Sequence, residues 1–347
     1  TRVDTGLGAR IWLRNVFGPL HHLSIEGQLG YGWLFNSDSD DPAGVYGQGL
    51  VRYSRPGLMG RLGDFRLSAR FRDQLYPGFH LREFTAGPGV RSTLAKGLFV
   101  DADVLFRLGQ QVGFGPFDDN TVERFAIARD DTSMGAEAQL SLIWDQRDNP
   151  LEALKGHLLG LGLTFMPGGP LGTHRYLTLA PDMRGFLPLT KSISIGVRAA
   201  GGWVLLQGDN GVPLGPRLFG GGAYGMRGFG QQQMSPRVML CTQQNNGEAC
   251  AGQVVGGTSL LEGSLEVRWL PPLKPFGAVL WGDIGGAHET ANPFGRGVNA
   301  ALGLGLRLRF WYLPAALDVG YRLLGDSAWQ APADDPFTVF FRLGEAF

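Results

Sequence analysis

The sequence predicts an all-β protein, a transmembrane antiparallel β-barrel. Three observations lead to this fold class. Apolar and polar residues alternate along most of the chain, 55 of the 347 residues are glycine while only 18% are charged, and no run approaches the ~18 apolar residues that a transmembrane helix requires. A barrel strand turns one face to lipid and the other to a polar interior, which accounts for a mean hydropathy of −0.03.

The alternation has period two and recurs in about fifteen segments, with no segment of helical period between them. In residues 261–269, Glu262, Ser264, Glu266 and Arg268 share one face, and apolar residues occupy most of the other. The same pattern is present in 65–72, 100–108, 136–145 and 302–310. Such segments are typical of strands in a barrel wall.

A soluble β-sandwich also alternates, and it is the main competing fold. So many strands exceed a typical single sandwich. Aromatic residues such as Trp269 and Trp281 also lie near strand ends, as in the girdles of membrane barrels. We therefore expect residues 1–347 to form one transmembrane barrel domain.

The connections between strands differ in length. Short ones carry turn residues at 17–19, 55–57, 95–97, 148–150, 271–272 and 313–314, and long ones cover 36–44, 109–133, 288–297 and 325–336. This asymmetry is typical of outer-membrane barrels, which have short periplasmic turns and long extracellular loops. The longest connection runs from Gln207 to Thr258, and loops of such length are usually functional or disordered.

A glycine-rich stretch, FGGGAYGMRGFG at 219–230, lies within this longest connection. Gly220, Gly222 and Gly225 match the G-x-G-x-x-G dinucleotide fingerprint, which requires a βαβ unit around it. The surrounding chain predicts only strands, so we expect no nucleotide and no other cofactor. The alternative interpretation is a flexible loop with one arginine, Arg227, between two glycines.

Cys241 and Cys250 flank a polar stretch in the same connection, and we expect them to form a loop disulfide in an oxidising compartment. Two thiols with no nearby histidine are too few ligands for a metal site. The formal net charge is zero, so no nucleic-acid partner is expected.

The last segment, 337–347, alternates and ends on an aromatic residue. Phe341, Leu343, Gly344 and the terminal Phe347 resemble the C-terminal signal by which bacterial outer-membrane proteins are recognised for assembly. The competing interpretation is simply a final strand that ends in phenylalanine.

The motifs together resemble the BamA/TamA superfamily of outer-membrane assembly and secretion barrels. Residues 220–229 with Ser235-Pro236 are similar to its signature loop, and AVLWGDIGG at 278–286 is similar to the strand that carries its acidic partner. Further segments match in order at 15–18, 144–156, 261–269, 298–310, 315–321 and 337–347. The resemblance covers nearly the whole chain and implies a barrel of the 16-strand type, with the long loop folded into the lumen.

The resemblance also implies a site. The loop motif would be Gly225, Met226, Arg227, Gly228 and Phe229, and the acidic partners of the arginine would be Asp283 and Glu266. A planar guanidinium can bind carboxylates with two parallel hydrogen bonds, and glycines permit close approach to the wall.

Two departures from the family pattern follow. Residues 1–347 contain no POTRA modules, and Thr5–Asn15 resembles the second strand of the family, which leaves only Thr1–Asp4 for the end of the first. We therefore expect the first strand to be missing or incomplete. If the protein is exported, we expect its signal to have been removed or to lie outside this chain.

The leading functional hypothesis is an outer-membrane insertion and assembly factor of Gram-negative bacteria, acting without chemistry through a seam between first and last strands. Its partners would be outer-membrane lipids, unfolded outer-membrane client proteins and periplasmic or inner-membrane subunits. The alternative is a two-partner-type secretion pore or an autotransporter barrel. A barrel enzyme is a third option, but none of the six histidines lies in a recognisable nucleophile motif.

Overall fold

The computed structural model describes residues 2–34, 44–58, 63–76, 79–113, 115, 117–150, 152–208, 210–244, 247–272, 275–310, 313–325 and 336–343. The first ten strands are β1 (Arg2–Arg14), β2 (His22–Leu34), β3 (Gly44–Arg55), β4 (Asp64–Tyr76), β5 (Phe79–Ala95), β6 (Leu98–Val112), β7 (Thr132–Asp145), β8 (Gly156–Pro167), β9 (Arg175–Pro188) and β10 (Ile193–Gln207). The others are β11 (Arg237–Gln244), β12 (Gly247–Val254), β13 (Ser259–Trp269), β14 (Phe276–His288), β15 (Asn299–Phe310), β16 (Leu313–Leu324) and β17 (Phe337–Leu343). One helix, α1 (Asp119–Phe125), and one 3-10 turn, η2 (Gly169–Leu171), complete the described elements.

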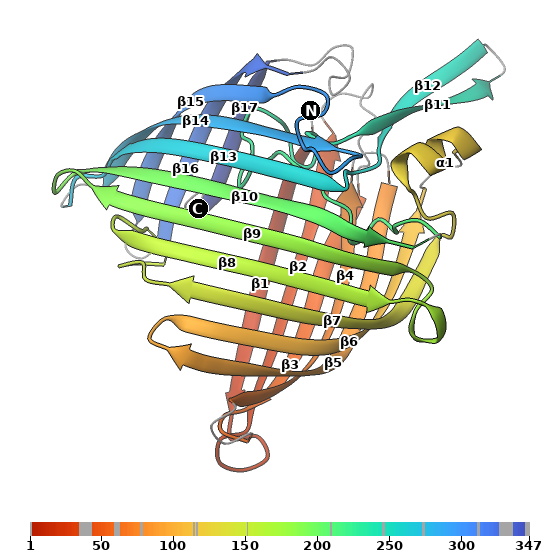
Figure 1. Cartoon of the computed structure of the whole chain (residues 1–347). Coiled ribbons are helices and arrows are strands. Elements are labelled where there is room, and N and C mark those ends of the chain that lie inside the picture. The colour runs from red at the N-terminus through yellow and green to blue at the C-terminus, as the bar shows by residue number, and fades with distance from the viewer. Residues whose placement is uncertain are drawn as a thin grey trace.

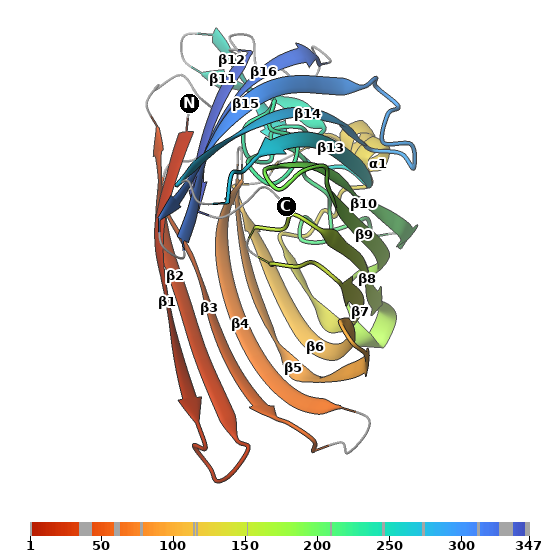
Figure 2. The same ribbon diagram turned by 90° about the vertical axis from the view of Figure 1, so that its left-hand side faces the viewer.

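Fifteen of these strands form one antiparallel sheet, in which strands consecutive in sequence pair except that β10 pairs with β13. The sheet curls through Figure 1, and in the turned view of Figure 2 the blue C-terminal strands return toward the red N-terminal ones. This is the antiparallel barrel architecture that the sequence predicts. Within the described residues, no backbone pairing joins the two outermost strands, β1 and β17.

The two faces of the sheet differ as the period-two pattern predicts. On β15, Leu302, Leu304 and Leu306 are 50%, 66% and 57% exposed. Arg307, on the opposite face of the same strand, is 2% exposed. The exposed leucines face outward, where a membrane supplies an apolar solvent. No helix within the described ranges is long and apolar enough to span a membrane.

The start of the chain differs from the expectation. Val3 and Asp4 pair with Trp33 and Gly32 of β2, in the same register as the rest of β1. Residues 2–4 are therefore not the remnant of a separate strand, because the polar-apolar alternation continues without a turn into Leu7. The main sheet has 15 strands among the residues described, which agrees with a barrel of the 16-strand type whose first strand is missing or incomplete.

Two connections contain secondary structure that the sequence patterns did not predict. The connection after β6 contains α1, whose first turn is capped by Asp118, since its side chain accepts a hydrogen bond from Thr121 N at 3.2 Å. The connection after β10 contains the β11–β12 hairpin, which projects from the sheet in Figure 1. Seven helical residues are too few for a helical period to be recognised.

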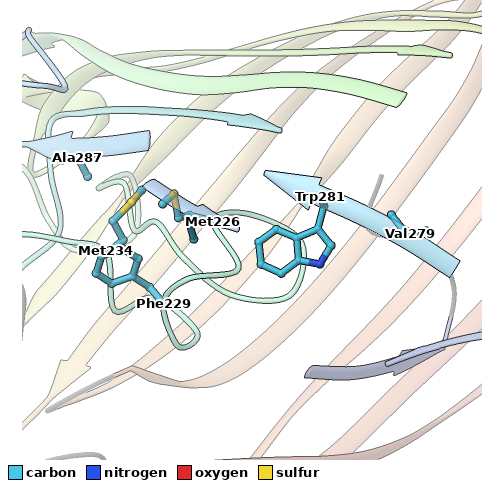
Figure 3. Packing of buried hydrophobic residues seen from close by; sticks show 7 residues of the cluster. Met226, Phe229, Met234, Val279, Trp281 and Ala287 are labelled. Carbon is cyan, nitrogen blue, oxygen red and sulfur yellow. The ribbon is translucent and has the colours of Figure 1, made fainter. Parts of the chain in front are cut away.

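The buried core lies inside the sheet, between its inner wall and the chain segment that connects β10 to β11. One cluster joins Met226, Phe229 and Met234 of that segment to Val279 and Trp281 of β14, as Figure 3 shows. A second cluster joins Leu214 of the segment to Tyr76, Phe79 and Leu81 at the β4–β5 connection. The segment therefore crosses the lumen and packs against both sides of it. We call residues 208–236 the lumen loop.

Candidate functional site in the barrel lumen

The glycine-rich part of the lumen loop folds into a compact turn. Gly222 N donates to the carbonyl oxygen of Phe229 at 3.0 Å, and Phe229 N donates to that of Met226 at 3.2 Å. Gly222 has a φ of 109°, a left-handed value that residues with a side chain rarely adopt. The turn presents residues 225–229 to the wall as a tip.

Two glycines of the predicted loop motif, Gly225 and Gly228, allow the loop backbone to lie close to the barrel wall. A Cβ on Gly228 would lie 2.5 Å from Ala301 Cβ of β15, and one on Gly225 would lie 2.6 Å from the Glu262 carboxylate of β13. Neither position has a positive φ. Glycine is therefore required at 225 and 228 because the loop lies too close to the wall for a side chain. The tight reversal of the backbone occurs at Gly221 and Gly222, which have positive φ.

Arg227 reaches both predicted acidic partners. Its Nε and Nη2 donate to Oδ2 and Oδ1 of Asp283 at 2.9 and 2.7 Å, and its backbone N also donates to Oδ2 at 2.9 Å. Its Nη1 donates to Glu266 Oε1 at 2.5 Å. The fourth side-chain hydrogen bond goes to Ser264, whose hydroxyl accepts from Nη2 at 2.8 Å and donates to Asp283 at 2.6 Å.

This arginine is buried, with 1% of its surface exposed. Burial by itself lowers the pKa of Arg227, but the hydrogen bonds that it donates to Asp283 and the negative charge of Glu266 raise the pKa by more, so the net direction is upward. A buried guanidinium without these carboxylates would cost several kcal/mol, roughly 3–5 when one partner of a pair is removed. The loop tip is thus fixed by charge as well as by packing.

Trp281 completes the pocket for Arg227, and its position corrects the expectation of a girdle residue. Its ring lies 4.1 Å from Arg227 Cζ, and the side chain is 1% exposed. The indole faces inward, as Figure 3 shows, because odd-numbered residues of β14 point into the lumen. The face of the ring attracts the cation. Trp269, in contrast, is 41% exposed on the outer face.

A third carboxylate on the same wall, Glu262, holds the loop backbone. Its Oε1 accepts from Gly221 N at 2.8 Å and from Met226 N at 3.0 Å. The sequence pattern placed Glu262 on the inner face with Glu266, but nothing distinguished it from an ordinary lumen acid. Its role depends on where the loop backbone turns, which only the structure shows.

The tip also contacts the last two strands. Thr338 Oγ1 of β17 donates to the carbonyl oxygen of Arg227 at 2.5 Å, and Arg342 Nη1 of β17 donates to that of Ala223 at 3.1 Å. Arg322 of β16 donates to Gly228 O at 3.0 Å and stacks over Phe229 at 4.0 Å. These are functional candidates that the sequence did not single out.

The charges of the wall continue the network. Asp318 of β16 lies 2.6 Å from Arg342 Nη1, 3.1 Å from Arg307 Nη1 and 3.9 Å from Arg227 Nη1. Asp318 is fully buried. Buried acids and arginines alternate in space, so each charge is compensated by neighbours.

A further contact leads from the tip to the opposite end of the barrel. Glu266 Oε2 accepts from Arg268 Nε at 2.7 Å, and Arg268 Nη1 donates to the carbonyl oxygen of Ala153 at 3.1 Å. Ala153 lies in the β7–β8 connection and is 2% exposed against Phe186. The side chains of Glu266 and Arg268 therefore connect the loop tip with this short-turn end.

The base of the lumen loop is held by a different arginine. Arg217 is 4% exposed and donates to the carbonyl oxygens of Val255, Gly256 and Phe125 at 2.6, 2.9 and 2.8 Å. Burial lowers the pKa of Arg217 to about 10, only partly offset by the charge of Glu289. This side chain fastens the loop to α1 and to the end of the β11–β12 hairpin.

The arrangement described so far is a network of buried ion pairs around an arginine-bearing loop in a barrel lumen. A model of the Omp85 superfamily domain matches residues 108–347, which include the loop and every acidic partner named above. The chain belongs to the Omp85 superfamily. An Omp85 protein of this type is a bacterial outer-membrane barrel concerned with the assembly or secretion of proteins.

Solved structures agree with this Omp85 assignment. The chain is similar to BamA from Haemophilus ducreyi lacking POTRA domains 1–3, with 11% identity and a TM-score of 0.69 over 99% of this chain and 69% of that one. It is also similar to CdiB from Acinetobacter baumannii, with 14% identity and a TM-score of 0.59 over 99% of this chain and 59% of that one. At these identities the likeness shows the fold. No curated protein sequence matches.

Of the other predicted residues of the Omp85 chain, Phe341 is the one whose side chain the structure describes. Phe341 of β17 is 69% exposed on the outer face. Leu343 ends β17, while Gly344 and Phe347 lie outside the described residues, so the C-terminal assembly signal stays a prediction. Cys241 and Cys250 occupy directly opposite positions of the hairpin, but their side chains lie outside the described part, and the disulfide also stays a prediction.

No group of three or more potential metal ligands occurs within the described residues. The contacts around Arg227 are hydrogen bonds, ion pairs and packing that position a loop.

Proposed function

We propose that this Omp85 barrel inserts client proteins into the outer membrane through a seam between β1 and β17. The observation that carries the proposal is the contact of the lumen-loop tip with the last strand, through Thr338 and Arg342. The loop is itself fixed to β13 and β14 through Arg227. It thereby ties the strand at the edge of the sheet to the firmly paired part of the wall.

The proposed activity uses the backbone groups of an edge strand. An edge strand presents N–H and C=O groups to any extended chain beside it, a property that most proteins suppress. A client strand that pairs with β17 would add to the sheet by β-augmentation. The loop would keep β17 in the orientation that accepts the client, and no chemical step is required.

The test is the Arg227→Ala variant in cells, with Arg227→Lys as a second variant. Alanine leaves Asp283 and Glu266 without their cation, and lysine keeps the charge but cannot form the paired hydrogen bonds. We expect client barrels to accumulate unassembled with alanine, an intermediate defect with lysine, and protease cleavage of the loop in both. Normal client assembly together with a protected loop would refute the proposal.

A second candidate function is a secretion pore, and one observation favours it. Polar side chains on the inner face of β2 to β4, among them Gln28, Gln48 and Arg70, are exposed to the lumen. A polar lumen wall could pass an extended hydrophilic chain. Measuring a client both in the membrane and in the medium distinguishes the two functions, because only a pore releases it.

A further inference from the structure

An arginine pair lies on the lumen face of β3 and β4, outside the network around Arg227. Arg52 of β3 is opposite Ser68 of β4, and Leu50 of β3 is opposite Arg70 of β4. Arg52 and Arg70 are therefore diagonal neighbours on the same face, separated by one step along the strand pair. This face points into the lumen, because Arg66 on the same side of β4 binds acids of β6.

Five other arginines of this inner wall have acidic partners. The pairs are Arg10–Glu26 at 2.8 Å, Arg66–Asp103 at 2.9 Å, Arg72–Glu83 at 3.5 Å, Arg91–Asp101 at 2.8 Å and Arg107–Glu137 at 2.9 Å. In the part of the chain that the structure describes, Arg52 and Arg70 form no such pair. Two like charges side by side repel each other. An anion between them would relieve that repulsion.

The pair is also accessible. Arg70 is exposed and Arg52 half-buried, and the neighbouring Gln28 and Gln48 are exposed with their amides 2.9 Å apart. The lumen loop packs instead against the far ends of β4 and β5, through Leu214. The middle of this wall is therefore open to a chain that enters the lumen.

Trp12 extends the same surface. Ser24 of β2 lies opposite both Trp12 of β1 and Arg52 of β3, so the three residues form one row across the wall. Trp12 is 58% exposed. An indole, two amides and two guanidinium groups can contact the side chains and the backbone of an extended peptide, whereas a free phosphate would use the guanidinium groups alone.

We propose that Arg52 and Arg70 form a docking site for the carboxylates of an acidic stretch in an unfolded client polypeptide. The inference rests on the proposed function only in that a client is handled unfolded. The positive wall attracts the acidic stretch into the lumen. The site selects by charge and is separate from the loop tip.

The binding test uses the purified full chain in detergent and three unstructured peptides of equal length. They carry aspartate, asparagine or lysine at alternate positions, and binding is followed by fluorescence anisotropy. We expect the aspartate peptide to bind about five- to tenfold more tightly than the asparagine peptide. This preference should disappear at about 0.5 M salt, where the Debye length is a few ångström.

Variants then locate the site. The double variant Arg52→Gln/Arg70→Gln should bind the aspartate and asparagine peptides equally. Arg52→Lys/Arg70→Lys should keep the preference for the aspartate peptide. Arg52→Glu/Arg70→Glu should prefer the lysine peptide. The matched control is Arg91→Gln, which removes one lumen charge from an arginine that is already paired. Displacement of the aspartate peptide by inorganic phosphate at equal concentration would overturn the polypeptide assignment.

If the glutamine double variant misfolds, the glutamate double variant still tests the site. Preference for the lysine peptide over the aspartate peptide can arise only when the lumen is folded. An unchanged preference in the glutamine double variant, or loss of it in Arg91→Gln, would refute the site. Neither result would affect the proposed function, which is judged separately by client assembly in Arg227→Ala cells.

Discussion

Thr338 Oγ1 lies 2.5 Å from the carbonyl oxygen of Arg227, so the tip of the lumen loop is hydrogen-bonded to the last strand of the sheet. The same residue, Arg227, is fixed to β14 through Asp283. A single position thus joins the edge strand to the interior of the wall.

Replacing Thr338 with valine keeps the shape of the side chain and removes the donor. A hydrogen bond of this kind contributes about 1 kcal/mol, so we expect the loop to detach roughly fivefold more often. Limited proteolysis of the lumen loop in the folded barrel measures this. Thr338→Ser retains the hydroxyl and should behave as wild type. Equal cleavage of all three proteins would contradict the link.

Gly228 lies close to Ala301 of the wall, so a side chain added at 228 should destabilise the barrel and a smaller residue at 301 should compensate. Gly228→Ala places a methyl group 2.5 Å from Ala301 Cβ, and overpacking of this kind costs roughly 1–3 kcal/mol. We expect lower resistance to urea, followed by heat-modifiable gel mobility. Adding Ala301→Gly removes the opposing methyl group and should restore much of the loss. Absence of rescue would show that the loop does not rest on β15.

The chain of contacts from Arg227 through Glu266 and Arg268 to Ala153 predicts coupling between the two ends of the lumen. Arg227→Met and Arg268→Met share the partner Glu266, so their effects on unfolding free energy should be non-additive by about 0.5–3 kcal/mol. Arg309→Met is the control, because Arg309 binds Glu152 in the same β7–β8 connection without touching Glu266. Additive effects for Arg227 and Arg268 would exclude the coupling.

Glu289 predicts acid sensitivity of the long-loop end. It accepts from Arg124 of α1 at 3.1 Å and from Arg296 at 2.7 Å. Burial raises the pKa of Glu289, but the hydrogen bond from Arg296 and nearby positive charge lower it more, so the net direction is below its usual 4.5. A carboxyl with a depressed pKa in the folded state stabilises above its unfolded pKa and loses that contribution as the pH falls through the folded value.

The measurement is a pH titration of a dye attached to α1 through Glu123→Cys, with Cys241→Ser and Cys250→Ser to leave a single thiol. We expect α1 to become mobile below about pH 4.5, and anisotropy of the dye reports it. With Glu289→Gln, α1 should be more mobile at neutral pH than in the wild type and should show no transition from this group. A transition that persists in that variant would assign the effect elsewhere.

The opposed positions of Cys241 and Cys250 predict a disulfide within the β11–β12 hairpin. Mass spectrometry of unreduced protein should show the peptides linked, and reduction should expose the hairpin to trypsin. The main sheet should be unaffected, because β11 and β12 pair only with each other. Two free thiols in protein prepared without reductant would contradict this prediction.

The sequence by itself determined the strands and their faces. Period-two alternation reports burial directly, so the inner positions of Glu262, Glu266 and Arg268 on β13 could be predicted from the pattern. The resemblance of the loop motif also pointed to Arg227 with Asp283 and Glu266. Those residues are close together in the structure.

Only the tertiary structure decided what lies across the lumen. Whether Trp281 faced lipid or Arg227, whether Glu262 held a loop, and whether Thr338 met the tip all depend on contacts between segments far apart in sequence. Alternation fixes the side of the sheet that a residue occupies but not its partner across the barrel. Partners follow from the curl of the sheet and the path of the loop, which depend on the packing of the whole chain.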